Sequence, residues 1–259
     1  MKKCIISDLG SIVTGKTPST KNFSYWGEEI PFVTPKDIQI SKHIFSTERF
    51  LTLSGLDAVK GCYLPSNTIC VSCIGSIGYV AITTTPSVSN QQINSIIVNK
   101  NHDVDFVYYL MKSLWMYFKN YEGQSTTVSI LNKSQFSNIE VLIPNDINIE
   151  KKIGIILSKL DDKIELNEKI NQNLEAQAQA IFKSWFVDFE PFKNGKFVDS
   201  ELGKIPEGWR VIKFSEFLCP RTEKSNSSTI TEYSVTNNGI CRRDEKFKKQ
   251  LSGTKTSNK

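Results

Sequence analysis

The sequence of 259 residues is marked first by what it lacks. No apolar run approaches the ~18 residues that a helix needs to span a bilayer, so a membrane protein of that kind is not expected. Only two histidines occur, His43 and His102, and neither has an obvious cysteine or aspartate partner for a catalytic triad. There is also no Asn/Asp-Pro-Pro-aromatic motif to hold an extruded adenine, and no glycine-rich turn with a downstream acid for a methyl-donor nucleoside. These absences predict a protein that binds its target without a reactive centre.

Cysteine is sparse and is not arranged for disulfides or metal. The six cysteines, at positions 4, 62, 70, 73, 219 and 241, lie mostly in apolar, strand-like settings. The first residues hold two lysines and a short apolar patch, as a signal peptide does. However, Asp8 and Gly10 interrupt the patch and no small-residue cleavage site follows, so we expect a first strand there and not a signal peptide. We therefore expect reduced thiols in a cytoplasmic protein. Cys70 and Cys73 have the spacing of a zinc-binding pair, but no second pair follows, so we expect small core residues there.

Charge is nearly balanced in the first part of the chain. The formal net charge is +5, yet residues 1–149 carry 12 Lys+Arg against 11 Asp+Glu. Residues 150–190 carry 6 against 8, and residues 191–259 carry 14 against 8. Bulk charge therefore does not predict nucleic-acid binding for the first part. Such a prediction has to come from where particular residues stand.

Residues Gly10–Thr17 satisfy the phosphate-loop pattern letter for letter. That pattern works only when the loop joins a buried strand to a helix whose first amides meet the phosphates. Here Pro18 follows at once, and residues 19–27 are turn-rich without a helical period. A polar loop is therefore predicted, and a nucleotide hydrolase is an unlikely alternative.

Periodicity predicts a mixed α/β (α+β) fold for the first part of the chain. Strand patterns occur within residues 3–14, 30–40, 67–83, 91–98 and 139–144. Residues 105–121 are rich in aromatic side chains and have a helical period, which more often reflects core packing than a surface for stacking bases. A short turn is expected at residues 134–136.

A long helix is predicted between residues 150 and 190. Spacings of four and three alternate along a seam formed by Ile153, Leu157, Leu160, Ile164, Asn167, Asn171, Leu174, Ala178 and Ile181. Gly154 is the last Gly or Pro of this stretch, so about 30 residues and about 45 Å of helix are expected. Such a helix needs a second long helix over its seam, and the two Asn are typical of a coiled coil that fixes its register at some cost in stability. The alternative is an amphipathic helix lying on its own domain.

The same patterns divide the chain into four parts: a first domain at 1–149, the long helix at 150–190, a turn-rich linker at 191–209 and a polar tail at 210–259. After the linker, Ile212–Phe217 repeats the pattern of Cys4–Leu9, with apolar residues at the first, third and last positions, the same Ser and a following acid. The repeat predicts that a second copy of the first domain begins there. We expect the copy to be incomplete.

Polar loops are the remaining functional signal. Amides and hydroxyls read base edges and lysines hold phosphates, which is the mixture that DNA readout needs. The candidate DNA contacts are Thr14, Lys16, Thr17, Ser19, Lys21, Thr34, Lys36, Ser72, Ser76, Asn90, Gln91, Gln92, Gln124, Thr126 and Thr127. The alternative is that these loops are polar only because they are exposed.

Several stretches together resemble the DNA-specificity (S) subunit of Type I restriction-modification enzymes. They are Asp8–Pro18 (DLGSIVTGKTP), Ile30–Ile38 (IPFVTPKDI), Gly75–Ala81 (GSIGYVA), Asn90–Gln92 (NQQ), Leu160–Asn167 (LDDKIELN), Ala180–Phe189 (AIFKSWFVDF) and Leu202–Trp209 (LGKIPEGW). Each is weak alone, and the combination is specific. One departure is that Cys73 and Ile74 stand where the family commonly carries an Arg, so a phosphate contact is not expected there.

The resemblance implies two target-recognition domains held apart by antiparallel helices, each reading one half of a split site in double-stranded DNA. It implies that this chain is not an enzyme and binds no cofactor. The partners would be a methyltransferase (M) subunit that uses S-adenosylmethionine and a restriction/translocase (R) subunit that uses ATP and magnesium.

An incomplete second domain resembles a half-subunit of this family. Two copies are then expected to pair their 153–181 helices antiparallel, as a homodimer that reads a palindromic split site. Two alternatives remain open: a truncated product without activity, and a coiled-coil adaptor that does not contact DNA.

Overall fold

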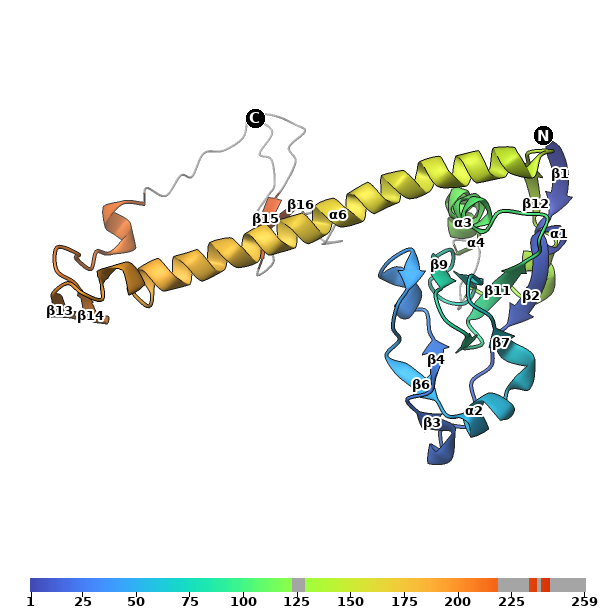
Figure 1. Ribbon diagram of the computed structural model, residues 1–259, viewed down its shortest axis with the longest axis horizontal. Helices are drawn as coiled ribbons and strands as arrows, with labels where there is room; N and C mark the ends of the chain where they lie inside the picture. Colours follow the sequence, from blue (N-terminus) through green and yellow to red (C-terminus); the bar gives the residue numbers. More distant parts are fainter. Residues whose placement is uncertain (123–128, 219–232, 237–238, 243–259) are drawn as a thin grey trace, which may run out of the picture. The chain divides into compact units, whose positions relative to one another are not determined.

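The computed structural model describes residues 1–122, 129–218, 233–236 and 239–242 (Figure 1). The chain divides into two units, Met1–Ala176 and Gln177–Lys259, and each is considered by itself. The first unit has the mixed strands and helices that the sequence predicts. None of the helices in the described residues is both long enough and apolar enough to cross a membrane.

The first sheet of unit 1 is buried on both faces. Its strands, in order, are β2 (Gly10–Thr14), β11 (Ile93–Val98), β8 (Ile69–Ser72), β9 (Val80–Thr83) and β5 (His43–Ile44). Neighbours run antiparallel, except that β5 and β9 are parallel. Along β8 the side chains alternate: Ile69 and Val71 face a core shared with helices, and Cys70 faces a core shared with the second sheet. This double burial explains why the strand reads as a continuous apolar run.

The second sheet packs against the first. Its strands, in order, are β3 (Trp26–Gly27), β6 (Arg49–Leu51), β4 (Ile30–Val33), β10 (Ser87–Ser89) and β7 (Tyr63–Leu64). Val33, Leu64 and Ile93 fill the layer between the sheets. The outer core of this sheet includes Phe32 and Leu51, next to the short helix α2 (Leu53–Asp57) and the 3-10 turn η3 (Lys60–Cys62). The strand predictions within residues 30–40, 67–83 and 91–98 are thus confirmed.

Helices cover the other face of the first sheet. They are α1 (Ile6–Leu9), α3 (Val104–Ser113), α4 (Trp115–Glu122) and α5 (Lys133–Ser137), and beside them β1 (Lys2–Ile5) pairs antiparallel with β12 (Glu140–Ile143). Phe106, Tyr108 and Phe118 are buried in the core below, as the core-packing prediction requires. The turn expected at residues 134–136 is instead the helix α5, because the Asn132 side chain caps it by accepting the Gln135 N–H at 2.9 Å.

The long helix is longer than the seam predicts. Helix α6 (Ile147–Phe186) has 40 residues, about 60 Å at 1.5 Å per residue. It begins three residues before position 150 because Asp146 caps it, with Oδ1 accepting the Asn148 N–H at 2.9 Å. The apolar period starts later than this cap, which is why the seam alone places the start of the helix too late.

Glu150 attaches the start of α6 to the rest of unit 1. This residue is 1% exposed. Its carboxylate lies 2.9 Å from His102 Nδ1 and accepts the Asp103 N–H at 3.0 Å. One turn later, a Cβ placed on Gly154 would lie 2.6 Å from Asp103 Oδ1 and 3.1 Å from the Phe106 nitrogen. Glycine therefore lets α6 approach the N-terminal end of α3, which lies beside it in Figure 1.

A second attachment lies about two turns further along α6. The Lys42 ammonium contacts the Asp105 carboxylate at 2.6 Å and donates to Ser158 Oγ at 2.7 Å. The Tyr109 hydroxyl donates to Asp161 Oδ2 at 2.8 Å. Burial raises the pKa of Tyr109 above its ordinary value, and the neighbouring Asp161 carboxylate raises it further, so this hydroxyl keeps its donor proton.

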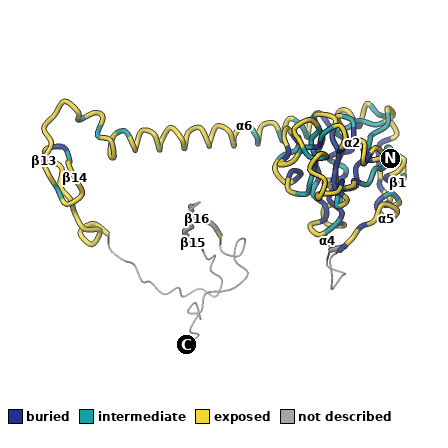
Figure 2. Tube along the Cα trace, turned by 90° about the horizontal axis from the view of Figure 1, so that it is seen from below, coloured by how far each residue is buried: buried dark blue, intermediate teal, exposed yellow. Residues whose placement is uncertain are grey.

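Beyond the second attachment, the apolar seam residues Ile164, Leu174 and Ile181 of α6 are exposed, and no hydrophobic cluster of the described residues includes them. Residues 166–183 are all exposed, and Figure 2 shows the helix exposed along most of its length. A helix that carries a regular apolar seam normally covers it with another helix. The exposed seam is therefore an unpartnered surface.

Unit 2 contains an aromatic cluster at the end of α6. A hairpin, β13 (Phe197–Ser200) and β14 (Gly203–Pro206), follows the 3-10 turn η4 (Glu190–Phe192). Ring centroids of Phe186, Phe189 and Phe192 lie 5.9, 5.3 and 5.4 Å from that of Trp209. Residues 191–209, expected as a turn-rich linker, thus carry a hairpin, and its flanking Trp209 packs on the end of the helix.

The internal repeat has a matching local geometry. In the first copy the Asp8 carboxylate accepts the Ile5 N–H at 3.0 Å. At the equivalent positions of the second copy, within the 3-10 turn η5 (Phe214–Glu216), Glu216 accepts the Lys213 N–H, also at 3.0 Å. The described part of the tail also has a short hairpin, β15 (Tyr233–Thr236) with β16 (Gly239–Arg242). A second recognition domain beginning here stays a prediction.

The Glu150 attachment generates a stability prediction. Glu150→Ala leaves the Asp103 N–H and the His102 ring unpaired in a buried setting, so the free energy of unfolding should fall by about 1–3 kcal/mol. Urea unfolding followed by circular dichroism measures the loss, and hydrogen exchange should show it at residues 147–161. The control Glu168→Ala changes an exposed residue of the same helix. Equal stability of the two variants would contradict the assignment.

Candidate nucleic-acid interface

Polar loops from both sheets of unit 1 meet at one edge. The loop after β2 is joined to the β10–β11 turn, where Lys16 N–H donates to Ser89 O at 2.9 Å and Gly15 N–H donates to Ile93 O at 3.1 Å. The loop after β4 joins the same turn, since the Asn90 N–H donates to Val33 O at 3.0 Å. Segments more than 50 residues apart in sequence are thus neighbours.

The loop between β8 and β9 also belongs to this edge. The Cys73 N–H donates to Gln92 O at 2.7 Å, which places the Gly75–Gly78 turn beside the β10–β11 turn. The Gly75 N–H donates to Ser129 O at 3.2 Å. The candidates Gln124, Thr126 and Thr127 lie outside the described residues. We call the surface formed by these loops the reading edge; it comprises residues 14–21, 34–36, 73–78, 89–92 and 129–133.

Several predicted contacts are exposed on the reading edge. These are Lys16, Ser19, Lys21, Lys36, Ser76 and Gln91. Thr17 is half-buried and donates its hydroxyl hydrogen to Gln91 Oε1, which orients the Gln91 amide. Gln92 is half-buried beside it. The edge therefore presents ammonium, hydroxyl and amide groups, the donors and acceptors that contact phosphates and base edges.

Other predicted contacts are held inside the fold. Ser72 is completely buried, and its hydroxyl donates to Ser76 O at 2.7 Å and accepts the Tyr79 N–H at 3.0 Å. Asn90 is 8% exposed, and its side chain bonds the Gln92 N–H and the Gln92 side chain. These side chains shape the turns. A DNA contact by Ser72 would leave buried groups unpaired, so the structure removes it from the set.

Two threonines of the predicted set are also engaged locally. Thr34 donates its N–H and its hydroxyl hydrogen to Asp37 Oδ2, each at 2.7 Å. Thr14 donates to Asn94 Oδ1 at 2.6 Å, on the neighbouring strand. Both hydroxyls thus fix the ends of the strands that carry the loops, and any further contact would use their remaining acceptor capacity.

The sequence reasoning missed Lys133 at this edge. Burial raises the pKa of the Cys62 thiol, while the ammonium groups of Lys16 and Lys133 both act to lower it. Lys16, in the loop after β2, and Lys133, at the start of α5, thus both act on the Cys62 thiol, whose Sγ lies 3.4 Å from the Thr14 carbonyl oxygen. The signal available in the sequence was the position of Lys133, four residues after the end of the polar stretch 122–129.

The structure excludes the phosphate-loop alternative. Residues 10–14 of the motif are the strand β2, paired with β11 over its whole length. The amides of Gly15 and Lys16 are bonded to carbonyl groups of the fold, and the next helical element in the chain is the 3-10 turn η1 (Phe23–Tyr25). Phosphate binding requires free backbone amides at the start of a helix, and residues 10–17 do not provide them.

The zinc alternative fails for a geometric reason. Cys70 and Cys73 point into different cores, on opposite sides of the first sheet. Burial raises the pKa of each thiol to about 12, which disfavours the thiolate that binds metal. Among the described residues, no group of three or more His, Cys, Asp or Glu side chains could hold a metal ion.

Comparison with known proteins assigns the family. The Type I restriction modification DNA specificity domain matches residues 1–176, which include the reading edge and most of α6. The chain belongs to the Type I restriction-modification DNA specificity family. This confirms the resemblance that the motifs carry.

The relatives within the family are specificity subunits of Type I restriction enzymes. The chain is 40% identical over 222 residues to the Type I restriction enzyme MjaIX specificity subunit of Methanocaldococcus jannaschii, which covers 82% of this chain and 50% of that protein. It is 37% identical over 173 residues to the HindI specificity subunit of Haemophilus influenzae, covering 64% of this chain and 38% of that protein. The chain thus spans half or less of these relatives.

Solved structures in this family share the fold. The S subunit of a Type I restriction-modification system from M. genitalium superimposes with a TM-score of 0.52 at 18% identity, covering 74% of this chain and 48% of that one. A subunit of another Type I system gives 0.53 at 12% identity, covering 71% of this chain and 44% of that one. The likeness supports the mixed α/β architecture with its long helix.

The close contact at Gly15 generates a prediction for the reading edge. A Cβ at this position would collide with the carbonyl oxygens of Ser89 and Asn90, so Gly15→Ala must push two loops apart. We expect a loss of about 1–3 kcal/mol in the free energy of unfolding, measured by urea titration. The control Gly61→Ala meets no atom within 4 Å and should stay within about 0.5 kcal/mol of the wild type. Equal effects would show that the loops are not in contact.

Proposed function

We propose that this chain is a DNA sequence-recognition subunit of a Type I restriction-modification complex, which reads one half of a bipartite site. The observation that carries the proposal is the reading edge, where five segments of unit 1 bring lysine, hydroxyl and amide groups onto one surface. The named relatives are specificity subunits of the same kind of enzyme. The chain itself would bind DNA and position the methyltransferase and restriction subunits, without catalysing a reaction.

Within this proposal the side chains divide by chemistry. Lys16, Lys21 and Lys133 hold phosphates, because ammonium groups on flexible stems bind charge without sequence preference. Gln91 and Ser76 read base edges, because an amide or a hydroxyl can donate and accept in the major groove. Thr17 orients the Gln91 amide through their hydrogen bond, which reduces the entropy lost on binding.

Methylation and cleavage would belong to partner subunits. We infer a methyltransferase that binds S-adenosylmethionine and an ATP-driven, magnesium-dependent translocase with nuclease activity, while this chain provides the sequence recognition. The unpaired thiols of Cys4, Cys62, Cys70 and Cys73 fit a cytoplasmic protein. Methylome sequencing of a host that carries this chain with its cognate methyltransferase tests the proposal. Adenine methylation at one split motif supports it, and methylation without any sequence preference overturns it.

The lysines of the reading edge generate a prediction for binding. Lys16→Ala combined with Lys21→Ala should weaken binding to every DNA sequence and make the slope of log K against log salt shallower by about two. Gln91→Ala should instead relax the preference at one base pair, by about 1–3 kcal/mol.

Gel shifts at several salt concentrations measure both effects. Lys100→Ala is the matched control, because this exposed lysine follows the other end of β11 from the reading edge. If the Lys100 variant behaves like the double variant, the reading edge is not the DNA surface. If none of the variants changes binding, a coiled-coil adaptor without DNA contact is the better description.

We further propose that two copies pair through α6. Leu160, Ile164, Leu174 and Ile181 of the seam are 55%, 57%, 57% and 56% exposed in the single chain. Covering such a seam with a second helix removes apolar area from water, and Asn167 and Asn171 near its middle would fix the register. An antiparallel pair relates two reading edges by a twofold axis, which fits a palindromic split site.

The pairing prediction concerns oligomeric state. At tens of micromolar, light scattering on the purified chain should give the mass of a dimer, and Leu174→Lys should convert it to a monomer because a charge would be buried in the seam. Ala176→Lys is the control, since position 176 lies on the opposite side of the helix from the seam. A strictly monomeric wild type would overturn the homodimer and leave the DNA proposal standing.

A further inference from the structure

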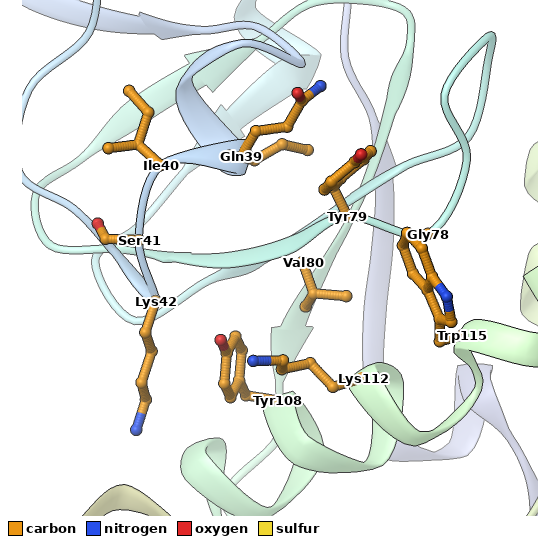
Figure 3. Close-up of a pocket in the computed structure, with 11 residues that line it drawn as sticks. Gln39, Ile40, Ser41, Lys42, Gly78, Tyr79, Val80, Tyr108, Lys112 and Trp115 are labelled. Atoms are coloured by element: carbon orange, nitrogen blue, oxygen red, sulfur yellow. The ribbon is translucent and has the colours of Figure 1, made fainter. Parts of the chain in front are cut away.

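Unit 1 has a hollow of about 500 Å³ beside the reading edge, with which it shares Gly78. Its lining comes from three places in the chain: residues 38–42, the start of β9, and the helices α3 and α4. Tyr79, Tyr108 and Trp115 supply aromatic rings, and Figure 3 shows Val80 between the two tyrosines. The volume is in the range of pockets that bury a small aromatic ligand.

The aromatic rings of this hollow lie among cations. The Tyr79 and Trp115 rings meet edge to face with centroids 5.5 Å apart. Lys119 Nζ lies 4.3 Å from the Trp115 ring centroid, and Lys112 Nζ lies 5.4 Å from that of Tyr108. The face of an aromatic ring can contact a cation, and it can also stack with another flat aromatic group. The site therefore suits a ligand that has both a flat ring and a negative charge.

Lys112 is the cation available to such a ligand. Lys42 also lines the hollow, and its ammonium lies 5.3 Å from the Tyr108 ring centroid, but that ammonium is already engaged by Asp105 and Ser158. In the described part of the chain, Lys112 has no carboxylate within ion-pairing distance and is exposed, with its ammonium beside the Tyr108 ring. An anionic group bound next to Tyr108 would therefore meet an ammonium that no acid neutralises.

The hollow is rigidly connected to the reading edge. Gly78 and Tyr79, which line it, belong to the turn that carries Ser76. The Gly78 N–H donates to Ser72 O, and the Tyr79 N–H donates to Ser72 Oγ, both at 3.0 Å. Two residues thus separate the candidate DNA contact Ser76 from the first ring of the hollow.

We propose that this hollow is a nucleotide-binding pocket, in which the base contacts Tyr79 and Trp115 and the phosphate pairs with Lys112. The shared chemistry is a nucleobase with a phosphate, and it has two possible sources. One is a free mononucleotide, which is independent of the proposed DNA-reading function. The other is a nucleotide displaced from the bound duplex, which rests on that function.

Two measurements on the full chain test the pocket and separate these sources. Titration calorimetry with deoxyadenosine and deoxycytidine monophosphates measures binding of free nucleotide. The second measurement uses a duplex that contains the motif found by methylome sequencing, with 2-aminopurine placed at successive positions. Displacement of a base from this duplex increases the fluorescence of the 2-aminopurine. Lys112→Ala and Trp115→Ala should each weaken nucleotide binding, or the fluorescence response, about tenfold or more. The first removes the side chain that pairs with the phosphate, and the second removes a ring that contacts the base. Met116→Ala, at the exposed neighbour of Trp115, is the control and should change neither.

The outcomes are distinguishable. Mononucleotide binding that both variants lose assigns the pocket to a free ligand, whether or not the chain binds DNA. A 2-aminopurine response that both variants lose, with unchanged gel shifts, assigns it to a nucleotide of the duplex. Absence of both signals in the wild-type chain overturns the pocket, even where gel shifts show DNA binding. Absence of DNA binding in the wild type overturns the proposed function, and the calorimetry then decides on the pocket alone.

Discussion

The two-point attachment of α6 to unit 1 is the constraint on which the geometry of this chain depends. A single contact would let the helix swivel, whereas Glu150 and the Ser158–Asp161 stretch hold it at places about 12–16 Å apart along its axis. Both the direction and the rotation of the helix are then fixed relative to the sheets. The first contact is buried, so it is screened little by solvent. Any object bound to the free part of α6 is thereby oriented relative to the reading edge.

The reading edge depends on a second constraint, the close approach of loops from different sheets. Strand β2 ends in the first sheet and the chain crosses to β3 in the second, while β10 and β11 make the reverse crossing in a short turn. Both crossings lie at the same edge, and Gly15 has no side chain to keep them apart. The hydrogen bonds of Lys16 and Asn90 then use backbone groups alone, which leaves the exposed side chains free to vary without loss of the fold.

The sequence predicts those parts of the structure whose signal is local. The strands around the Gly75–Gly78 turn are apolar runs bounded by glycine, and the seam of α6 is a long regular period. The attachments of α6 leave no such signal. Lys42 and Glu150 look like ordinary solvent charges, and their partners Ser158 and His102 stand 116 and 48 residues away. Tertiary contact alone decides their burial.

The same limit applies to the candidate site. Ser72 and Ser76 both sit in one polar loop, and polarity gives no reason to separate them. In the structure the first is buried and bonded to the second's carbonyl group, while the second is exposed. Lys133 was missed because it begins helix α5, which is brought to the edge only by folding. Local chemistry thus identifies which loops matter, and packing decides which of their side chains are available.

The near-neutral charge of the first domain bears on how such a protein could achieve specificity. Residues 1–149 carry almost equal numbers of cations and acids, so a few lysines on one edge give only a modest electrostatic contribution to binding. One reading domain would then bind a half-site weakly. Linking two readers raises affinity through effective concentration, but only if the linkage presents both surfaces in a geometry that fits the duplex. A long helix fixed at two points meets that requirement. A flexible linker of equal length would let the second reader sample many positions in which it cannot contact the duplex. Rigidity in α6 and its attachments, which never touch DNA in this scheme, therefore contributes to specificity as directly as the loops do.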